Sequence, residues 1–474
     1  MAAAFAHHVA ADPGAPAFHD QAGGWVSRGE LEERSARLAG VLAAAGLGPG
    51  DRLLFSAGTS VALVVVQLAG LRSGITLVPA NPALTEPELA RLVADARPKA
   101  AYVDDAARRR LLAASGEGNR VAVFSAEDEL AGGPAPELDR QQPGDPALLV
   151  YTSGTTGRPK AVVLSHGNLL ANAEAITTAW RWTPEDRLVL ALPLFHVHGL
   201  GNGVCGTLVS GGSAVLRPGF AADDVLAAVE SERASMFFGV PTMLFRLVAA
   251  PGVGVLTRLR LLVSGSAPLP ASLHGEVAER TGQVVLERYG MTETLMITSN
   301  PYDGERRPGT VGFPLPGVEV RLDDGEIHVR GPNVFAGYLD DPAANEAAFD
   351  GPWFRTGDMG EIDADGYVSI VGRRKELIIS GGFNVYPREV EDVLLAHPAV
   401  AEVAVAGVSS DEWGEVVTAF VVAAPGEAGA PAAEELIEWC GARLTRYKTP
   451  RVVHLVDSLP RNALGKVVRS ELRP

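Results

Sequence analysis

The segment YTSGTTGRPK, residues 151–160, combines the residue types that bind phosphate groups. Its glycines, Gly154 and Gly157, leave backbone N–H groups accessible, and Lys160 supplies a compact positive charge. Such a loop can close over a polyphosphate, whereas a surface hairpin of glycine and threonine is the alternative interpretation. The short hydroxyl side chains that complete the set belong to Thr152, Ser153, Thr155 and Thr156.

This segment differs from a Walker-type phosphate loop, which needs the pattern GxxxxGK[ST] at the start of a helix. Here Pro159 interrupts the pattern before Lys160, and apolar, β-prone residues flank the segment at 147–150 and 161–164. The flanks predict a loop between two strands. Because no helix dipole is available there, phosphate binding would depend on the N–H groups, hydroxyls and lysine of the loop.

Five further segments carry groups suited to nucleotide and acyl chemistry. They are LPLFHVH (192–198), YGMTET (289–294), TGD (356–358), GRRKELIISGGFNVYP (372–387) and PRNALGK (460–466). In order and spacing, these segments and residues 151–160 resemble the motifs of the adenylate-forming superfamily of acyl-CoA synthetases, luciferases and adenylation domains. The resemblance extends over essentially the whole chain.

Members of that superfamily activate a carboxylic acid with ATP. The carboxylate attacks the α-phosphate, pyrophosphate leaves, and the acyl group then passes from the adenylate to a thiol. A carboxylate acylates poorly and its mixed anhydride with AMP acylates well, so the first step makes the second possible. The resemblance therefore implies ATP, Mg²⁺ and CoA as cofactors, with the β- and γ-phosphates held by residues 151–160.

Glu293 and Thr292 are the residues that the resemblance places opposite this loop. A carboxylate suits Mg²⁺, and the threonine hydroxyl suits an α-phosphate oxygen. Read alone, the pair equally fits a helix start with an acidic first turn. Asp358 resembles the carboxylate that binds both ribose hydroxyls, with Arg373 beside it, and its alternative is an ordinary turn aspartate. Further residues assigned to the nucleotide site are Ser266, Arg288, Tyr289, Gly290 and Met291.

The resemblance also implies residues that act in turn as the small domain rotates. Lys466 resembles the catalytic lysine that bridges the attacking carboxylate and the α-phosphate while charge develops between them. Lys375 occupies the hinge position. Gly381 and Gly382 fit a loop that approaches the pantetheine arm of CoA, since they have no side chain. His196 resembles the gate between the acyl pocket and the thiol tunnel, with a buried core histidine as the alternative.

The identity of the acid depends on residues outside the nucleotide motifs. Arg246 lies in GVPTMLFRLVAA, on the helix that lines the acyl pocket in relatives, and a cation there favours a dicarboxylic acid. Ser266 stands in SGSAPLP where many relatives carry glycine or alanine, and His198 and Thr207 complete the expected acyl-side residues. The segment ERYGMTETLMITSNPYDGERRPGTVG, 287–312, looks closest to that of CoA ligases that activate malonate and methylmalonate.

Two other functions stay open. One is a CoA ligase for another short, a medium-chain or an aryl acid, although the chain is short for the superfamily, which fits a small acid. The other is a non-catalytic nucleotide-binding regulator on the same fold, which is disfavoured because Lys466, Glu293 and Asp358 are all present. The chain ends without a carrier domain, so we expect a free-standing ligase of small molecules.

Composition limits the partners and the compartment. The chain has 474 residues and a formal net charge of −16, which argues against a nucleic-acid surface and requires anionic substrates to meet locally placed cations. The longest apolar stretch, 61–71, is too short to cross a membrane. No secretory leader is recognisable, and Cys205 and Cys440 lie far apart, so we expect a reducing, cytoplasmic location without disulfides.

Local patterns predict the elements that position these residues. Helical apolar spacing at 31–45 and at 60–72 alternates with short apolar runs typical of buried strands. This alternation predicts layered α/β architecture with largely parallel sheets. The runs are 52–56, 100–103, 121–124, 187–191, 214–216, 236–239 and 259–264.

After about residue 312 the pattern changes to shorter β runs at 319–322, 326–329 and 368–371, and a helix beginning with proline is expected at 387–395. Patterns and resemblance together predict an α/β fold with two parts. A large N-terminal region, 1–372, contains layered α/β subdomains and a β-rich subdomain. A hinge at 373–375 joins it to a small, mobile α+β C-terminal domain, 376–474.

Overall fold

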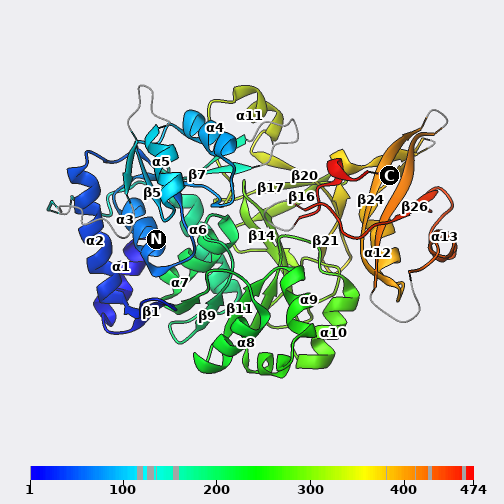
Figure 1. Cartoon of the computed structure of the whole chain (residues 1–474), viewed down its shortest axis with the longest axis horizontal. Helices are drawn as coiled ribbons and strands as arrows, with labels where there is room; N and C mark the ends of the chain where they lie inside the picture. The colour runs from blue at the N-terminus through cyan, green and yellow to red at the C-terminus, as the bar shows by residue number, and fades with distance from the viewer. Residues whose placement is uncertain are drawn as a thin grey trace.

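The computed structural model describes residues 2–114, 121–124, 133–134, 136–152, 160–380, 382–410, 413–424, 430–461 and 466–473. The molecule is elongated, with helices α1 (Ala2–Ala11) and α2 (Arg28–Ala44) at one end and a separate C-terminal domain at the other (Figure 1). The expected α/β fold is confirmed. Within the described part of the chain, no helix is both long and apolar enough to span a bilayer.

A seven-stranded sheet contains the strands on both sides of the expected phosphate loop. Strands β7 to β6 of this sheet run parallel, whereas β7–β8 and β8–β18 are antiparallel pairs. Its order is β18 (Gly337–Tyr338), β8 (Lys160–Ser165), β7 (Pro146–Thr152), β4 (Thr76–Pro79), β3 (Arg52–Ser56), β5 (Ala100–Val103) and β6 (Ala122–Phe124). The helices that connect or cover it are α2, α3 (Val61–Arg72), α4 (Glu86–Ala96) and α5 (Ala106–Ala114).

A nine-stranded sheet forms the other half of the large region. From β13 to β1 its neighbouring strands are parallel, and β14, β15 and β2 add antiparallel edges. Its order is β15 (Phe313–Pro314), β14 (Leu295–Ser299), β13 (Leu286–Met291), β12 (Leu261–Ser264), β11 (Met236–Gly239), β9 (Arg187–Leu190), β10 (Ser213–Leu216), β1 (Pro16–Asp20) and β2 (Gly24–Ser27).

Apolar side chains alternate between the two faces of this sheet, and so define two cores. Leu188 and Phe238 belong to a core shared with the seven-stranded sheet, which contributes Phe55 and Leu148. Val189 lies on the opposite face, in a second core. The helices packed there are α8 (Ala222–Ser231), α9 (Pro241–Ala249) and α10 (Ala271–Thr281). The shared core receives side chains from α1, α2, α3, α6 (His166–Ala179) and α7 (Cys205–Ser210).

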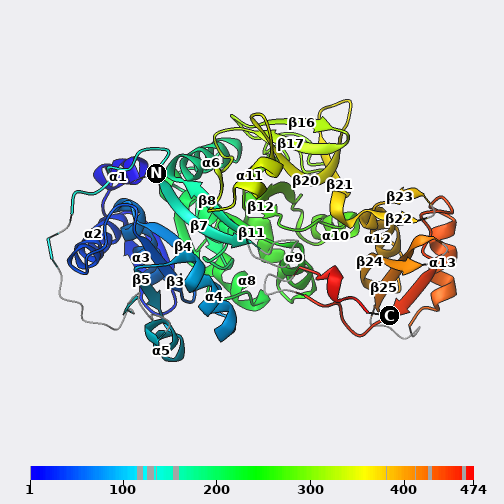
Figure 2. The ribbon, with the colours of Figure 1, turned by 90° about the horizontal axis from the view of Figure 1, so that it is seen from above.

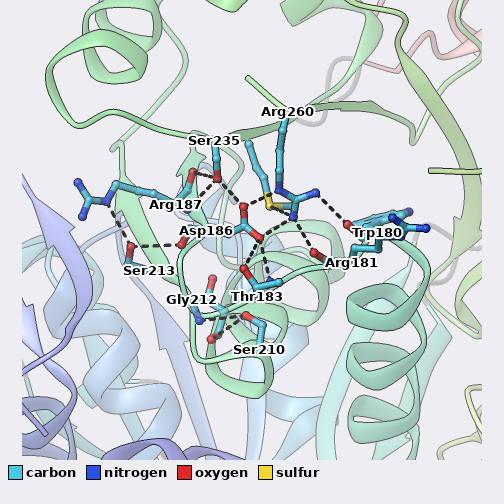
Figure 3. Close-up of polar contacts among 12 residues, drawn as sticks. Trp180, Arg181, Thr183, Asp186, Arg187, Ser210, Gly212, Ser213, Ser235 and Arg260 are labelled. Carbon is cyan, nitrogen blue, oxygen red and sulfur yellow. Dashed lines mark hydrogen bonds and ion pairs between the residues drawn. The ribbon is translucent and has the colours of Figure 1, made fainter. Parts of the chain in front are cut away.

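A buried polar network fixes the amino ends of four parallel strands of this sheet (Figure 3). Asp186, just before β9, accepts hydrogen bonds from Arg260 Nε at 2.6 Å and from Ser235 Oγ at 2.7 Å. Arg260 precedes β12 and Ser235 precedes β11, while Ser213 begins β10 and donates to the Asp186 carbonyl. Because ligands of parallel α/β sheets bind at the carboxyl ends of the strands, this network is structural.

The β-rich part and the small domain follow in sequence, and Figure 2 shows them side by side. The antiparallel sheet contains β16 (Glu319–Asp323), β17 (Glu326–Arg330), β19 (Phe349–Asp350), β20 (Trp353–Ile362) and β21 (Val368–Arg373), with α11 (Pro342–Ala348) beside it. The small-domain sheet contains β22 (Ile378–Ser380), β23 (Phe383–Val385), β24 (Val400–Ser410), β25 (Gly414–Ala423) and β26 (Val452–Leu455), covered by α12 (Pro387–Leu395) and α13 (Ala433–Gly441). A single 3-10 turn, Arg374–Glu376, joins the two sheets.

Candidate active site

The phosphate side of the candidate site lies where β7 and β8 meet. The two strands pair antiparallel with Thr152 opposite Lys160, so the predicted strand–loop–strand arrangement is confirmed. Lys160 Nζ lies 4.6 Å from the centre of the Tyr338 ring, in cation–π contact. The rest of the loop lies outside the described residues. The phosphate-binding roles therefore stay predictions for Ser153, Gly154, Thr155, Thr156 and Gly157.

Tyr338 joins this lysine to the expected metal ligand. Its hydroxyl donates to Glu293 Oε1 at 3.1 Å, and its strand, β18, pairs with β8 so that Tyr338 lies opposite Val162. Glu293 is only 8% exposed, in the turn of the β13–β14 hairpin beside the half-buried Thr292. The helix-start alternative for these two residues is therefore excluded.

Burial raises the pKa of Glu293, and the Tyr338 hydrogen bond and the positive charges of Arg373 and Lys160 oppose that rise. A divalent cation at this carboxylate would favour its charged form in the same way. One protein carboxylate together with the phosphate oxygens of a nucleotide is a donor set that Mg²⁺ uses. The residues present thus fit Mg²⁺, with Glu293 as its protein ligand.

The ribose side is built around Asp358 on β20. Arg373 is its partner across the β20–β21 ladder, and Arg373 Nε lies 2.8 Å from Asp358 Oδ1. Tyr289 donates its hydroxyl hydrogen to the other carboxylate oxygen, Oδ2. Burial raises the pKa of Asp358, while Arg373 and Tyr289 hold the carboxylate in its charged form. These contacts orient both oxygens, which still have lone pairs for a pair of hydroxyl groups.

Gly290 and Met291 continue the same strand toward the hairpin turn. A Cβ atom at Gly290 would lie 2.0 Å from the carbonyl oxygen of Leu295, so the hairpin closes only with glycine here. Both residues are half-buried beside Tyr289. This position agrees with their predicted place next to the nucleotide, which stays a prediction.

Arg288 points away from this ribose side, because successive side chains of a strand lie on opposite faces. Its guanidinium packs on Gly265, where an added Cβ would approach the central carbon to 2.5 Å. The side chain is 4% exposed, and among the described residues neither Nε nor Nη2 has a hydrogen-bond partner. Burial lowers the pKa of Arg288 to about 9, which still leaves it protonated at neutral pH. The structure thus holds a buried cation with two donor nitrogens that no described residue pairs with.

His198 and Ser266 lie on the same side as Arg288. Ser266 Oγ and His198 Nδ1 are 3.2 Å apart, and Ser266 has a left-handed backbone with φ of 69°. His198 begins a buried π-helical segment, His198–Val204, a form that occurs frequently at functional sites. Burial and the Arg288 charge keep the pKa of His198 well below its usual value. Its imidazole is therefore neutral beside the arginine.

His196 lies between Arg288 and the C-terminal lysine. Burial lowers its pKa to about 3, with the charges of Lys466 and Arg288 adding to the effect. The His198 backbone N–H donates to His196 Nδ1 at 3.2 Å, so the ring proton belongs on Nε2. A neutral histidine of fixed tautomer at this junction is compatible with either the gate or the core role.

Lys466 reaches this site from the small domain. Its charge lies close enough to lower the pKa of His196. The pKa of Lys466 itself is lowered, because burial and the Arg373 charge outweigh the opposing effect of Asp358 and Glu293. The C-terminal segment lies between the small-domain sheet and the large region in both ribbon views (Figures 1 and 2). The lysine is therefore within electrostatic range of Asp358, Glu293, Arg288 and His196.

The residues expected to act in the second step lie in two turns that follow β21. Lys375 lies in the Arg374–Glu376 turn between the two parts of the chain, and burial followed by the Arg373 charge lowers its pKa. Gly382, with φ of 82°, lies in the turn between β22 and β23. Gly381 lies outside the described residues. Their hinge and thiol-tunnel roles stay predictions.

Arg246 and Thr207, which the sequence argument places at the acyl pocket, do not present free polar groups in a buried pocket. Arg246 is exposed on α9, next to Phe245, which is 58% exposed, so its guanidinium is not shielded from water in this structure. Thr207 is buried, but its hydroxyl donates to Gly203 O at 2.7 Å within its own helical segment. Among the candidate arginines, Arg288 has the burial that pairing with a substrate carboxylate needs.

The sequence argument missed Tyr338 and Gly265. Tyr338 belongs to no recognisable motif. Its place beside the phosphate loop follows only from the pairing of β18 with β8. Gly265 was detectable as the residue before Ser266, but its role in making room for Arg288 depends on strands β12 and β13 being neighbours.

Comparison with known proteins identifies the family. Residues 5–339 match the AMP-binding enzyme family, and residues 389–466 match the AMP-binding enzyme C-terminal domain. The chain belongs to the AMP-binding enzymes. It is similar to feruloyl-CoA synthase from an Amycolatopsis species (37% identity over 94% of this chain and 92% of the relative) and to malonate–CoA ligase from Arabidopsis thaliana (38% identity over 69% and 60%).

Among solved structures, this AMP-binding enzyme resembles ATP-bound MatB from Rhodopseudomonas palustris, with 40% identity, coverage of 98% and 97%, and a TM-score of 0.93. Against the apo form of the same MatB, at equal identity and coverage, the TM-score is 0.84. As a whole, the chain thus superposes better on the ATP-bound form than on the apo form. That agrees with the position of Lys466 beside the nucleotide-side carboxylates.

Proposed function

We propose that this AMP-binding enzyme is an ATP-dependent acid–CoA ligase for a small dicarboxylic acid, malonate or methylmalonate. The observation that carries the substrate is the buried Arg288 guanidinium, whose Nε and Nη2 have no partner among the described residues. A cation buried without an anion is costly, and a substrate carboxylate would offset that cost. An acid with one carboxylate at the nucleotide and a second one a few bonds away fits this arrangement.

The first half-reaction assigns a task to each side of the site. Asp358 would orient the ribose, and Lys160 would bind the phosphates that leave as pyrophosphate. Lys466 would stabilise the charge that develops between the attacking carboxylate and the α-phosphate. Mg²⁺ held by Glu293 would neutralise phosphate charge. Arg288, on the opposite face of β13 from Tyr289, would hold the distal carboxylate away from the reaction.

In the second half-reaction, rotation of the small domain about Lys375 would remove Lys466 and bring the Gly381–Gly382 turn to the site. Transfer of the acyl group to the CoA thiol then gives acyl-CoA and AMP. The likeness to ATP-bound MatB supports an adenylation arrangement for the structure described. The likeness to malonate–CoA ligase supports malonate, although feruloyl-CoA synthase is similarly related.

A CoA ligase for an aryl acid is therefore the second candidate, and a panel of acids separates the two. Pyrophosphate release would be measured with malonate, methylmalonate, butyrate, benzoate and ferulate, each with and without CoA. We expect kcat/KM to be highest for the two dicarboxylates and acyl-CoA to form only when CoA is present. Highest activity with ferulate or benzoate would refute the dicarboxylate assignment, and no acid-dependent release with any acid would refute the ligase itself.

A further inference from the structure

The backbone on both sides of Lys466 is attached to the small domain. Arg461 and Val467 form an antiparallel bridge, and the Val468 N–H donates to Pro460 O at 2.9 Å. The residues before and after the segment 462–465 therefore run as two adjacent legs. We call residues 460–461 the first leg and residues 466–469 the second leg. The position of Lys466 depends on where these legs are attached.

The second leg is attached by Arg469, through three elements at once. Its Nη2 lies 2.7 Å from Glu391 Oε1 on α12, and its Nη1 lies 2.9 Å from Glu376 Oε2 in the Arg374–Glu376 turn. Its Nε donates to Val405 O on β24 at 3.2 Å. A guanidinium with all three nitrogens engaged in a fixed fork has little freedom to change its orientation.

Burial distinguishes this contact from an ordinary surface ion pair. The Glu391 side chain is 13% exposed and also accepts the Val405 N–H at 2.8 Å, and the Arg469 side chain is 28% exposed. On the first leg, Arg461 pairs with Glu402 at 2.7 Å, but these side chains are 31% and 45% exposed. Exposed pairs contribute little, so what distinguishes the Arg469 contact is its buried carboxylate, Glu391.

Through Glu376, Arg469 also contacts the hinge turn, because Glu376 directly follows the proposed hinge residue Lys375. The same guanidinium that holds the second leg thus also holds the first residue of the small domain after the hinge. A lysine attached in this way moves with the small domain as it rotates. A lysine on an unattached C-terminal segment would have to be ordered in each catalytic cycle, at an entropic cost.

We propose that Arg469 is a positioning residue for adenylation, which fixes the Lys466 segment to α12 and to the hinge turn. This inference rests on the proposed two-step reaction. Misplacement of a catalytic group by about 1 Å can cost on the order of 100-fold in rate, so loss of the attachment should slow the step that uses Lys466. The step that follows rotation, in which Lys466 has left the site, should be spared.

The test compares the two half-reactions in Arg469→Met, Arg469→Lys, Glu376→Gln and a matched control, Glu389→Gln. Glu389 is also on α12, but it pairs with Lys448 at 2.6 Å rather than with Arg469, and its exposure, 41%, is nearest to the 30% of Glu376. We expect Arg469→Met to lower kcat for adenylation 10- to 100-fold, about the scale of such misplacement, with KM for ATP changed less than about threefold. Thioester formation from supplied acyl-adenylate should stay within about twofold of the parent. Arg469→Lys should have a higher adenylation kcat than Arg469→Met. Glu376→Gln should have an adenylation kcat between those of Arg469→Met and the parent, and the control should match the parent.

Arg469→Met leaves the Glu391 carboxylate buried without its partner, so the small domain could lose stability for that reason alone. The double variant Arg469→Met/Glu391→Met removes both charges, and it should unfold at a temperature near the parent's while adenylation stays slow. Limited trypsin digestion gives a readout that needs no substrate: cleavage at Lys466 should be faster in both variants than in the control.

Parallel loss of both half-reactions, or unchanged adenylation and cleavage in a folded Arg469→Met protein, would overturn the positioning role. If the parent itself released no pyrophosphate with any acid, the proposed function would fail instead, and the digestion result would still decide whether Arg469 attaches the segment.

Discussion

Replacement of Arg288 by methionine tests the substrate assignment most directly. Methionine has a similar length and no charge, so it can occupy the space beside Gly265. If the Arg288 guanidinium pairs with the distal carboxylate inside a site shielded from water, its removal leaves that carboxylate buried and unpaired. The expected loss is about 2–5 kcal/mol, or roughly 30- to 5,000-fold in kcat/KM for malonate.

Butyrate provides the internal control, since it has no second carboxylate to lose. Its kcat/KM should stay the same or rise in Arg288→Met, because the apolar side chain then matches an apolar substrate. Pyrophosphate release with each acid, together with the thermal unfolding temperature of each protein, measures both effects. Equal losses for malonate and butyrate would show that Arg288 supports the fold and would refute its role in selecting the acid.

Arg246→Met is the matched variant, because the sequence argument gave this residue the same role. Exposed on α9, Arg246 should pair weakly with any carboxylate in solvent, and its replacement should change kcat/KM for malonate less than about threefold. A selective loss of malonate activity in Arg246→Met, with Arg288→Met unaffected, would restore the original assignment and refute the structural one.

Three further predictions concern the catalytic lysine, the hinge and the fold. Lys466→Ala should lose about 3–4 kcal/mol of transition-state stabilisation in adenylation while converting supplied acyl-adenylate normally, and equal loss in both steps would contradict its assignment. Lys375→Pro should leave adenylation intact and slow thioester formation, since proline fixes one backbone torsion, and an unchanged CoA step would exclude the hinge. Asp186→Asn should lower the free energy of unfolding by about 1–3 kcal/mol, because the partly buried Arg260 guanidinium loses its charged partner, and chemical denaturation would show whether it does.

The same ion pair predicts how stability depends on acid. Burial alone would raise the pKa of Asp186, but hydrogen bonds from Arg260, the Thr183 N–H and Ser235 bring it below the ordinary value of 3.8. A carboxyl group whose pKa is lower in the folded state stabilises the fold above its unfolded pKa and loses that contribution as the pH falls through the folded pKa. Between pH 5 and about pH 3, the parent should therefore lose more stability than Asp186→Asn does.

Much of the fold follows from local patterns that a reader can find in the sequence. The strands at 52–56, 100–103 and 236–239 and the helix at 387–395 are confirmed residue for residue, because buried parallel strands and amphipathic helices each have a distinct apolar spacing. The β13–β14 hairpin was not predicted. Its turn contains Thr292 and Glu293 and lacks the glycine or asparagine that usually marks a hairpin turn. The need for glycine at Gly290 comes from the Leu295 carbonyl across the hairpin, which the sequence does not show.

The sequence by itself determined the family, the motif order and which residues could act on a nucleotide, since residue type and spacing carry that information. Only the tertiary structure decided which arginine is shielded from water and where the C-terminal lysine stands. Residue type does not distinguish Arg288 from Arg246, and Arg288 is buried because Gly265 and His198, distant in sequence, pack around it. Lys466 meets Asp358 and Glu293 only through the arrangement of two domains, which depends on long-range contacts that no local spacing records.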